Sequence, residues 1–171
     1  MTLVDVDARR AEVAAALGVR FARPADAPAE QDLVIHTSGT ADGLRQCLEL
    51  AATDATVVEA SWHGDAPVAL PLGGAFHSRR IRLRASQVGT IPPAARPRWD
   101  HAGRMALALD LLHDEAFDVL LTGESTLDEL PALVAALADG TLDGLCHTID
   151  HAVSPAAGPA GGDAARHDPR T

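Results

Sequence analysis

His63 and Asp65 have residue types and a spacing that suit acid–base chemistry. They lie in the segment SWHGD, directly after an apolar run, where loops often carry active-site groups. A histidine beside a carboxylate can exchange protons with a substrate. No nucleophile motif of the G-x-S-x-G type accompanies the pair. We therefore interpret Trp62 and His63 as packing residues of a loop at the mouth of a cleft.

Cys146, His147 and His151 form a second group with metal-ligand residue types. Two histidines four residues apart can share one ion when they lie on one face of a helix. The segment LCHTIDH is typical of a strand and its exit instead, where residues four apart lie too far from each other for one ion. We expect satisfied or solvent-exposed histidines here and no metal site.

Residues 80–86 predict a strand with one apolar and one basic face. A strand with a solvated face belongs at a sheet edge or at an interface. The basic face could bind a phosphate or another polyanion, but the net charge of −10 favours an interface, with a second copy as the candidate partner. The apolar positions are Ile81, Leu83 and Ala85, and they alternate with Arg80, Arg82, Arg84 and Ser86.

The elements that position these groups begin at the N-terminus. A short β-favouring run containing Leu3 and Val4 is followed at once by strong helix formers from Ala8 to Leu17, and Gly18 is a typical helix stop. Asp5 therefore ends a strand that leads directly into a helix. Asp5 could also cap that helix, although Asp7 is the better N-cap candidate.

The next segments continue this alternation. Residues 33–35 form a continuous apolar run typical of a buried parallel strand, and a further strand is predicted around residues 57–58. A helix between them carries an apolar stripe. The order β-α-β-β-α-β predicts an α/β fold, a parallel sheet with helices on both faces. The stripe consists of Leu44, Cys47, Leu48 and Ala51.

The C-terminal third predicts a well-buried helix over residues 105–112, because that stretch is apolar almost all round. A strand, a helix and a last short strand follow. Thr126 and Glu129 have the spacing of a capping box, and Gly140 stops the helix. We expect disorder from residue 154 onward. The apolar stripe of the second helix comprises Leu130, Leu133, Val134 and Leu137.

Composition limits the function further. The chain has 171 residues, and its net charge of −10 excludes the basic footprint of a nucleic-acid binder. No apolar run has the ~20 residues that a membrane helix needs, and no export leader is visible. Cys47 and Cys146 are too few and too far apart for a disulfide framework. We expect a reduced, cytoplasmic setting.

Residues 2 to about 150 resemble the C-terminal half of zinc-type medium-chain alcohol dehydrogenases. The resemblance rests on the order and spacing of four segments: VDVDARRAEVAAALG, DLVIHTSGTADGLRQCLELA, ATVVEASWHGD and LTGESTLDELPALVAALADG…LCHTID. It implies an incomplete Rossmann-like parallel sheet followed by a C-terminal strand-helix-strand segment. It further implies NAD as cofactor, with NADP less favoured.

The resemblance also implies a set of cofactor-binding residues. Asp5 matches the acidic strand end whose carboxylate holds the adenosine ribose hydroxyls and disfavours the additional phosphate of NADP. Arg10 matches a basic position near that ribose. The turn made of Thr37, Ser38 and Gly39 would approach adenine and its ribose. Ser61 would lie near the nicotinamide, and the backbone of Ala85 and Ser86 would touch the nicotinamide amide.

The chain departs from the family pattern in two respects. The Gly-rich pyrophosphate turn would lie just upstream of Met1, and so would the catalytic domain with the cysteine and histidine ligands of the zinc. The resemblance therefore assigns no catalytic residue and no metal ligand here. We expect weak or undetectable catalysis by this chain alone.

The domain organisation that follows has three parts: residues 1–116 as a partial nucleotide-binding domain, residues 117–153 as a segment that would pack on the catalytic domain, and residues 154–171 as a tail. The edge strand 80–86 would pair two copies of the chain. Two alternatives stay open, namely a non-catalytic nucleotide-binding or partner-docking module, and a decayed gene.

Overall fold

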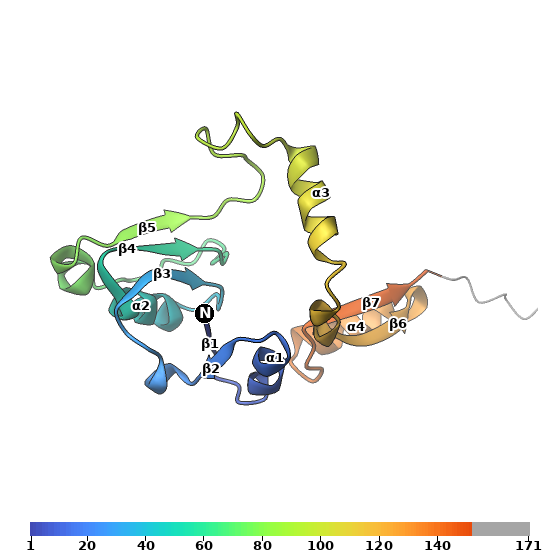
Figure 1. Cartoon of the computed structure of the whole chain (residues 1–171). Helices are drawn as coiled ribbons and strands as arrows, with labels where there is room; N and C mark the ends of the chain where they lie inside the picture. Colours follow the sequence, from blue (N-terminus) through green and yellow to red (C-terminus); the bar gives the residue numbers. More distant parts are fainter. Residues whose placement is uncertain (152–171) are drawn as a thin grey trace, which may run out of the picture. The chain divides into compact units, whose positions relative to one another are not determined.

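The computed structural model describes residues 1–151, so the predicted tail lies outside the described residues. The chain divides into two compact units, Met1–Val119 and a second unit that begins at Leu120. Every strand pair in the described residues is parallel (Figure 1). The predicted α/β class is therefore confirmed, with the strands distributed over three sheets.

The first unit begins with a β-α-β element made of β1 (Thr2–Val4), α1 (Arg10–Ala16) and β2 (Arg20–Ala22). Gly18 follows α1 with φ +68°, as expected for a helix stop. The predicted N-cap, Asp7, makes capping contacts one turn ahead of α1: its side chain accepts from the Arg9 amide, and its carbonyl accepts from the Arg10 amide.

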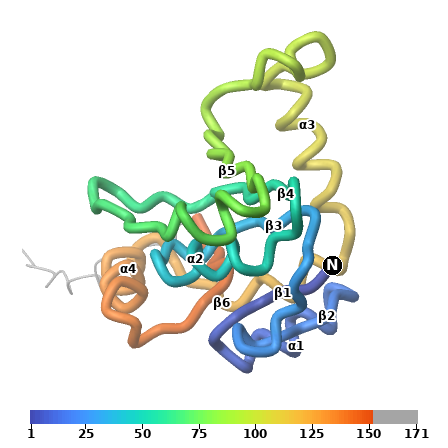
Figure 2. Tube along the Cα trace, turned by 90° about the vertical axis from the view of Figure 1, so that its left-hand side faces the viewer, coloured from blue at the N-terminus to red at the C-terminus, as the bar shows by residue number. Residues whose placement is uncertain are grey.

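The main sheet of this unit has the order β3-β4-β5, with β3 at Gln31–His36, β4 at Ala51–Glu59 and β5 at Arg82–Ala85. Helix α2 (Ala41–Leu50) connects β3 to β4 and lies against one face of the sheet in both views (Figures 1 and 2). This arrangement confirms the predicted order β-α-β-β-α-β. A short 3₁₀ turn at Pro24–Asp26 leads into β3.

The core of the unit lies between α2 and this sheet. Three of the four predicted stripe residues are buried on α2, and the fourth, Ala51, is buried as the first residue of β4. On the opposite face of the sheet, Leu33 and Ile35 remain 57% and 58% exposed. The cluster comprises Leu44, Cys47, Leu48, Ala51, Ala55, Val57 and Ile81.

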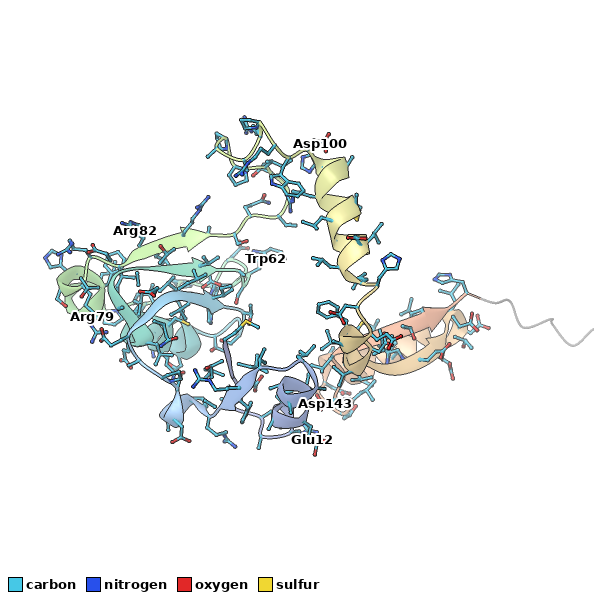
Figure 3. All side chains as sticks on the ribbon, viewed as in Figure 1. Glu12, Trp62, Arg79, Arg82, Asp100 and Asp143 are labelled. Carbon is cyan, nitrogen blue, oxygen red and sulfur yellow. The ribbon has the colours of Figure 1, made fainter. Side chains whose placement is uncertain are left out.

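The prediction of an edge position for the arginine-rich strand is confirmed, since β5 pairs only with β4 in the described sheet. Of the predicted basic positions, Arg82 and Arg84 lie within β5 and are exposed, whereas Arg80 precedes the strand. Arg80 lies in the turn before β5 with φ 52° and forms a two-pronged ion pair with Asp54, at 2.9 and 2.6 Å. Arg82 donates to the Asp54 carbonyl, and Arg79 donates to the carbonyl of Ala51 (Figure 3). These side chains are held by β4 of the same chain.

The prediction of a buried helix at residues 105–112 is wrong. Helix α3 (His101–Leu111) forms, and the Asp100 side chain accepts from the Gly103 amide at its N-terminus, but none of its residues is buried. Met105 is 62% exposed. Apolar residues on every side of a helix predict that other parts of a protein bury it. They do not specify which surface does so. The remaining short helical segments of this region are Leu72–Phe76 and Glu115–Leu120.

The second unit has a strand-helix-strand core made of β6 (Leu121–Thr126), α4 (Leu130–Ala138) and β7 (Cys146–Asp150). The 3₁₀ turn Leu127–Glu129 precedes α4 and carries the predicted capping box of Thr126 and Glu129. Within the predicted stripe only Leu133 is buried, while Val134 is 54% exposed. No helix in residues 1–151 is long and apolar enough to span a membrane.

Candidate functional site at the strand ends

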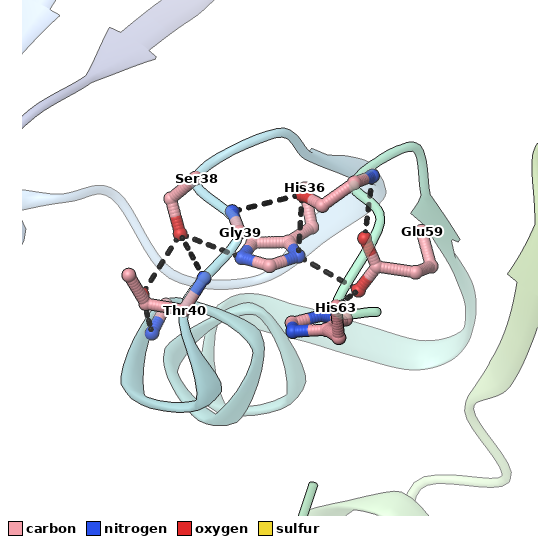
Figure 4. A network of polar contacts seen from close by, with 8 residues as sticks. His36, Ser38, Gly39, Thr40, Glu59 and His63 are labelled. Carbon is pink, nitrogen blue, oxygen red and sulfur yellow. Dashed lines mark hydrogen bonds and ion pairs between the residues drawn. The ribbon is translucent and has the colours of Figure 1, made fainter. Parts of the chain in front are cut away.

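Two polar side chains meet where neighbouring parallel strands end. His36 is the last residue of β3 and Glu59 the last residue of β4, and the two are paired in register. In parallel α/β sheets, ligands bind outside the carboxyl ends of the strands. We call the group His36, Ser38, Gly39, Glu59, Ser61 and His63 the strand-end site; Figure 4 labels all of these residues except Ser61.

His36 is the buried centre of the strand-end site. Its side chain is only 2% exposed, and both ring nitrogens have partners. Nδ1 lies 2.7 Å from the Glu59 carboxylate oxygen Oε2, and Nε2 lies 2.7 Å from the Ser38 hydroxyl. Because a carboxylate only accepts, Nδ1 carries a proton, and in the neutral tautomer Nε2 accepts from the Ser38 hydroxyl. The histidine therefore links the ends of β3 and β4.

Glu59 is held by donors from three directions. Its Oε1 accepts from the Ser61 amide at 2.7 Å, and its Oε2 lies 3.4 Å from His63 Nε2 as well as near His36. Burial raises the pKa of this carboxyl, but the hydrogen bonds from His36, the Ser61 amide and His63 together outweigh burial and lower the pKa below its usual range. Glu59 is therefore a carboxylate at neutral pH.

The turn after β3 approaches the turn after β4 closely. Gly39 has φ +67°, a conformation that favours glycine, and its amide donates to the Ser61 hydroxyl at 3.0 Å. Thr40 then caps α2 by accepting from the Gly43 amide at 3.1 Å. The space where a Cβ of Gly39 would point is open, with no atom within 4 Å. A ligand could therefore approach the backbone of this turn.

Three of the residues predicted to bind cofactor, Ser38, Gly39 and Ser61, lie together in the strand-end site. Ala85 pairs in register with Glu59, and the Ser86 amide donates to the Glu59 carbonyl at 2.8 Å. Both residues line an open hollow of about 640 Å³ in the first unit, which also includes Trp99 and Leu107. Thr37 is exposed between His36 and Ser38.

Asp5 and Arg10 lie on the separate β1–α1–β2 element. The Asp5 carboxylate accepts from the Asp7 amide at 2.8 Å, and Arg10 Nε lies 3.6 Å from Asp7 Oδ2. The hydrogen bond of Asp5 is the local turn-closing contact that an aspartate after a strand commonly makes. The structure does not bring these two residues into the strand-end site.

The prediction that Trp62 and His63 are packing residues of the SWHGD loop is right for His63 and wrong for Trp62. The His63 side chain is 17% exposed and stacks on His36, with ring centroids 5.9 Å apart and an interplanar angle of 12°. Trp62 is 91% exposed and therefore packs on nothing in this unit. Asp65 is exposed as well, and the carboxylate beside His63 in the described residues is that of Glu59.

Sequence reasoning did not find His36 and Glu59. The signal was present as a polar residue ending each of two apolar runs, VIH and VVE. Among residues 1–151, His36, Glu59 and His63 are the group of three metal-ligating side chains whose donor atoms lie within 4.8 Å of one another.

In the second unit, His147 Nε2 lies 2.9 Å from the Ser125 hydroxyl, as expected for a satisfied histidine.

Comparison with known proteins supports the fold. A scan against family models and a search of curated proteins gave no match. Solved structures do match. YhdH from Escherichia coli K-12 with bound NADPH is 21% identical with a TM-score of 0.59, over 84% of this chain and 44% of that chain.

Two further structures give a similar result. The Bacillus subtilis protein YhfP with NAD bound is 14% identical with a TM-score of 0.63, over 88% of this chain and 46% of that one. A Clostridium scindens protein assigned as a zinc-binding dehydrogenase is 18% identical with a TM-score of 0.63. The match covers 88% of this chain and 42% of that one. The chain thus has the mixed α/β fold of one part of dehydrogenase structures and spans less than half of their length.

Proposed function

We propose that the chain is the nicotinamide-dinucleotide-binding part of an oxidoreductase of the medium-chain dehydrogenase type. The observation that carries the proposal is the close approach of two turns at adjacent parallel strand ends, joined by the hydrogen bond from the Gly39 amide to Ser61. Fold similarity to structures holding NAD and NADPH supports it.

The residues at the strand ends fit a dinucleotide. Gly39 leaves its backbone open to a ligand, and the small side chains of Ser38 and Ser61 add hydroxyls without blocking the approach. His36 fixes Ser38 from one side, and Glu59 fixes the Ser61 amide from the other. In this proposal the turn formed by Thr37, Ser38 and Gly39 contacts adenosine. Ser61, Ala85 and Ser86 contact the nicotinamide, whose C4 carries or accepts a hydride when the cofactor is bound.

The proposal assigns Asp5 and Arg10, which lie on the separate β1–α1–β2 element, to the ribose of the dinucleotide. The Asp5 carboxylate can accept two hydrogen bonds from ribose hydroxyls and repels an added phosphate, so the proposal favours NAD over NADP. Oxidation of an alcohol or polyol, with zinc as Lewis acid, is the reaction we propose for a whole enzyme that contains this part. Cys47 and Cys146 are free thiols, in keeping with the cytoplasmic location we propose.

A second function, a non-catalytic docking module, is supported by the edge strand. β5 leaves one side of its backbone unpaired in the described sheet, and such edges can pair with a second copy or with another chain. A dimer through residues 80–86 is compatible with both functions. Nucleotide binding distinguishes them, because docking alone requires none.

The test is calorimetric titration of the full chain with NAD and, separately, NADP. We expect NAD to bind with a Kd below about 1 mM and more tightly than NADP. Asp5→Ala should weaken NAD binding about tenfold or more, whereas Asp26→Ala, an exposed aspartate of the same unit, should leave it unchanged. If neither dinucleotide binds, or if both aspartate variants behave alike, the proposal is wrong.

A further inference from the structure

We propose that His36, Glu59 and His63 form a binding site for one divalent first-row transition metal, with Zn²⁺ as the favoured ion. The site lies entirely within the first unit. It shares His36, Ser38 and Glu59 with the strand-end site of the dinucleotide proposal, but the metal needs no nucleotide in order to bind.

The donor set has the composition that such ions prefer. Two imidazole nitrogens and one carboxylate oxygen bind Zn²⁺, and three protein ligands leave a fourth position for water or another ligand. The donor atoms of the three residues all lie within 4.8 Å of one another.

One of the distances between donor atoms already matches a tetrahedral zinc site, and a second is shorter. Zinc bonds of about 2.0–2.1 Å place neighbouring ligand atoms roughly 3.3–3.4 Å apart. The distance from Glu59 Oε2 to His63 Nε2 is already 3.4 Å. The 2.7 Å contact between His36 Nδ1 and Glu59 Oε2 must open by about 0.6–0.7 Å, and the stacked ring of His63 must turn so that its Nε2 points at the same ion as His36 Nδ1.

The outer contacts of two ligands are already in place. Metal-bound histidines donate their other ring N–H to a neighbour, and ligating carboxylates are themselves hydrogen-bonded. His36 Nε2 lies 2.7 Å from the Ser38 hydroxyl, and Glu59 Oε1 accepts from the Ser61 amide at 2.7 Å. These contacts direct His36 Nδ1 and Glu59 Oε2 toward each other (Figure 4).

Coordination through His36 Nδ1 requires that the proton on this nitrogen move elsewhere. Nδ1 carries a proton in the metal-free state and must lose it in order to coordinate. The ring can take a proton on Nε2 instead, and Ser38 then changes from donor to acceptor by rotating its hydroxyl hydrogen. The number of protons on the ring is unchanged by this exchange of tautomer.

The different exposure of the three ligands indicates the side from which an ion can reach the site. His36 is only 2% exposed and forms the inner wall, while Glu59 and His63 are 15% and 17% exposed. The ion therefore enters from the side of the His63 loop. A buried histidine gives one rigid ligand, and the loop histidine can move to complete the site.

The test is a titration of the full chain, treated with chelator and free of nucleotide, with ZnCl₂ in a calorimeter. We expect one ion per chain with a Kd of about 10 µM or lower. His63→Gln and Glu59→Gln should each raise the Kd by about tenfold or more, and Ser38→Ala, which acts through His36, by about tenfold. His147→Gln should change nothing, because His147 lies in the second unit.

Cobalt provides a second readout that loss of folding cannot imitate. Co²⁺ bound by two nitrogens and one oxygen in a four-coordinate site should give intense visible absorption, and Zn²⁺ should displace it. His63 lies in a loop, so circular dichroism should show that His63→Gln is folded. The proposal is overturned if zinc does not bind at about 100 µM. It is equally overturned if His63→Gln binds zinc like the wild type, or if His147→Gln loses the ion. The dinucleotide titration is unaffected by any of these results, so the two proposals fail separately.

Discussion

The substitution His36→Phe tests whether the polar pair at the strand ends stabilises the first unit. Phenylalanine fills the volume of the buried ring but removes both nitrogens, so the contacts to Glu59 and Ser38 are lost together. A hydrogen bond to a charged group contributes about 1.5–3 kcal/mol and one to a neutral group about 0.5–1.5 kcal/mol. We therefore expect the free energy of unfolding to fall by about 2–4.5 kcal/mol.

Urea denaturation in the presence of chelator, followed by tryptophan fluorescence, measures this change. Both tryptophans, Trp62 and Trp99, lie in the first unit, so the signal reports on that unit without a contribution from the second. His113→Phe, at an exposed histidine of the same unit, is the matched control and should stay within about 0.5 kcal/mol of the wild type. A loss from His36→Phe no larger than that of the control would refute the reasoning, because it would mean that the contacts between His36, Glu59 and Ser38 add nothing to stability.

Three further predictions concern single residues. Gly39→Ala should destabilise the first unit by about 1 kcal/mol, since alanine disfavours φ +67°; unchanged stability would mean that the turn is not held in that conformation. The pKa of Glu59 is lowered in the folded chain, so its stabilising effect is fully present above its usual pKa of 4.5 and is lost as the pH falls through the folded pKa. The pH dependence of urea unfolding below about pH 5 should therefore be weaker in Glu59→Gln, and identical profiles would contradict this assignment. Burial raises the pKa of the Cys47 thiol to about 11, so iodoacetamide at neutral pH should modify Cys146 alone in the native chain and both thiols after unfolding. Mass spectrometry showing rapid native modification of Cys47 would contradict its burial.

Local patterns in the sequence predicted most of the secondary structure correctly. The apolar stripe of α2 and the capping box before α4 depend on residues three or four apart, and such spacing is visible in the sequence itself. The parallel pairing followed from the short alternation of strands and helices. These features are set by neighbouring residues, so no knowledge of distant contacts was needed.

The strand-end site was predicted only in part, because it depends on register between distant segments. His36 and Glu59 are 23 residues apart and meet only because β3 and β4 pair with those two residues opposite each other. Ser38, Gly39 and Ser61 were found through the family resemblance. The wrong prediction of a buried helix at α3 has a different cause. The apolar composition of α3 predicts burial, but no part of the described residues buries this helix.

The most direct test of the central claim is to record amide chemical shifts of the full, isotope-labelled chain while NAD is added. The account predicts that the largest shifts occur at Gly39, Ser61 and Ser86, at the carboxyl ends of β3, β4 and β5, together with Asp5, and that the amides of α4 stay unchanged. A saturating titration that moves no amide, or that moves those of α4 instead of the strand ends, would contradict the account.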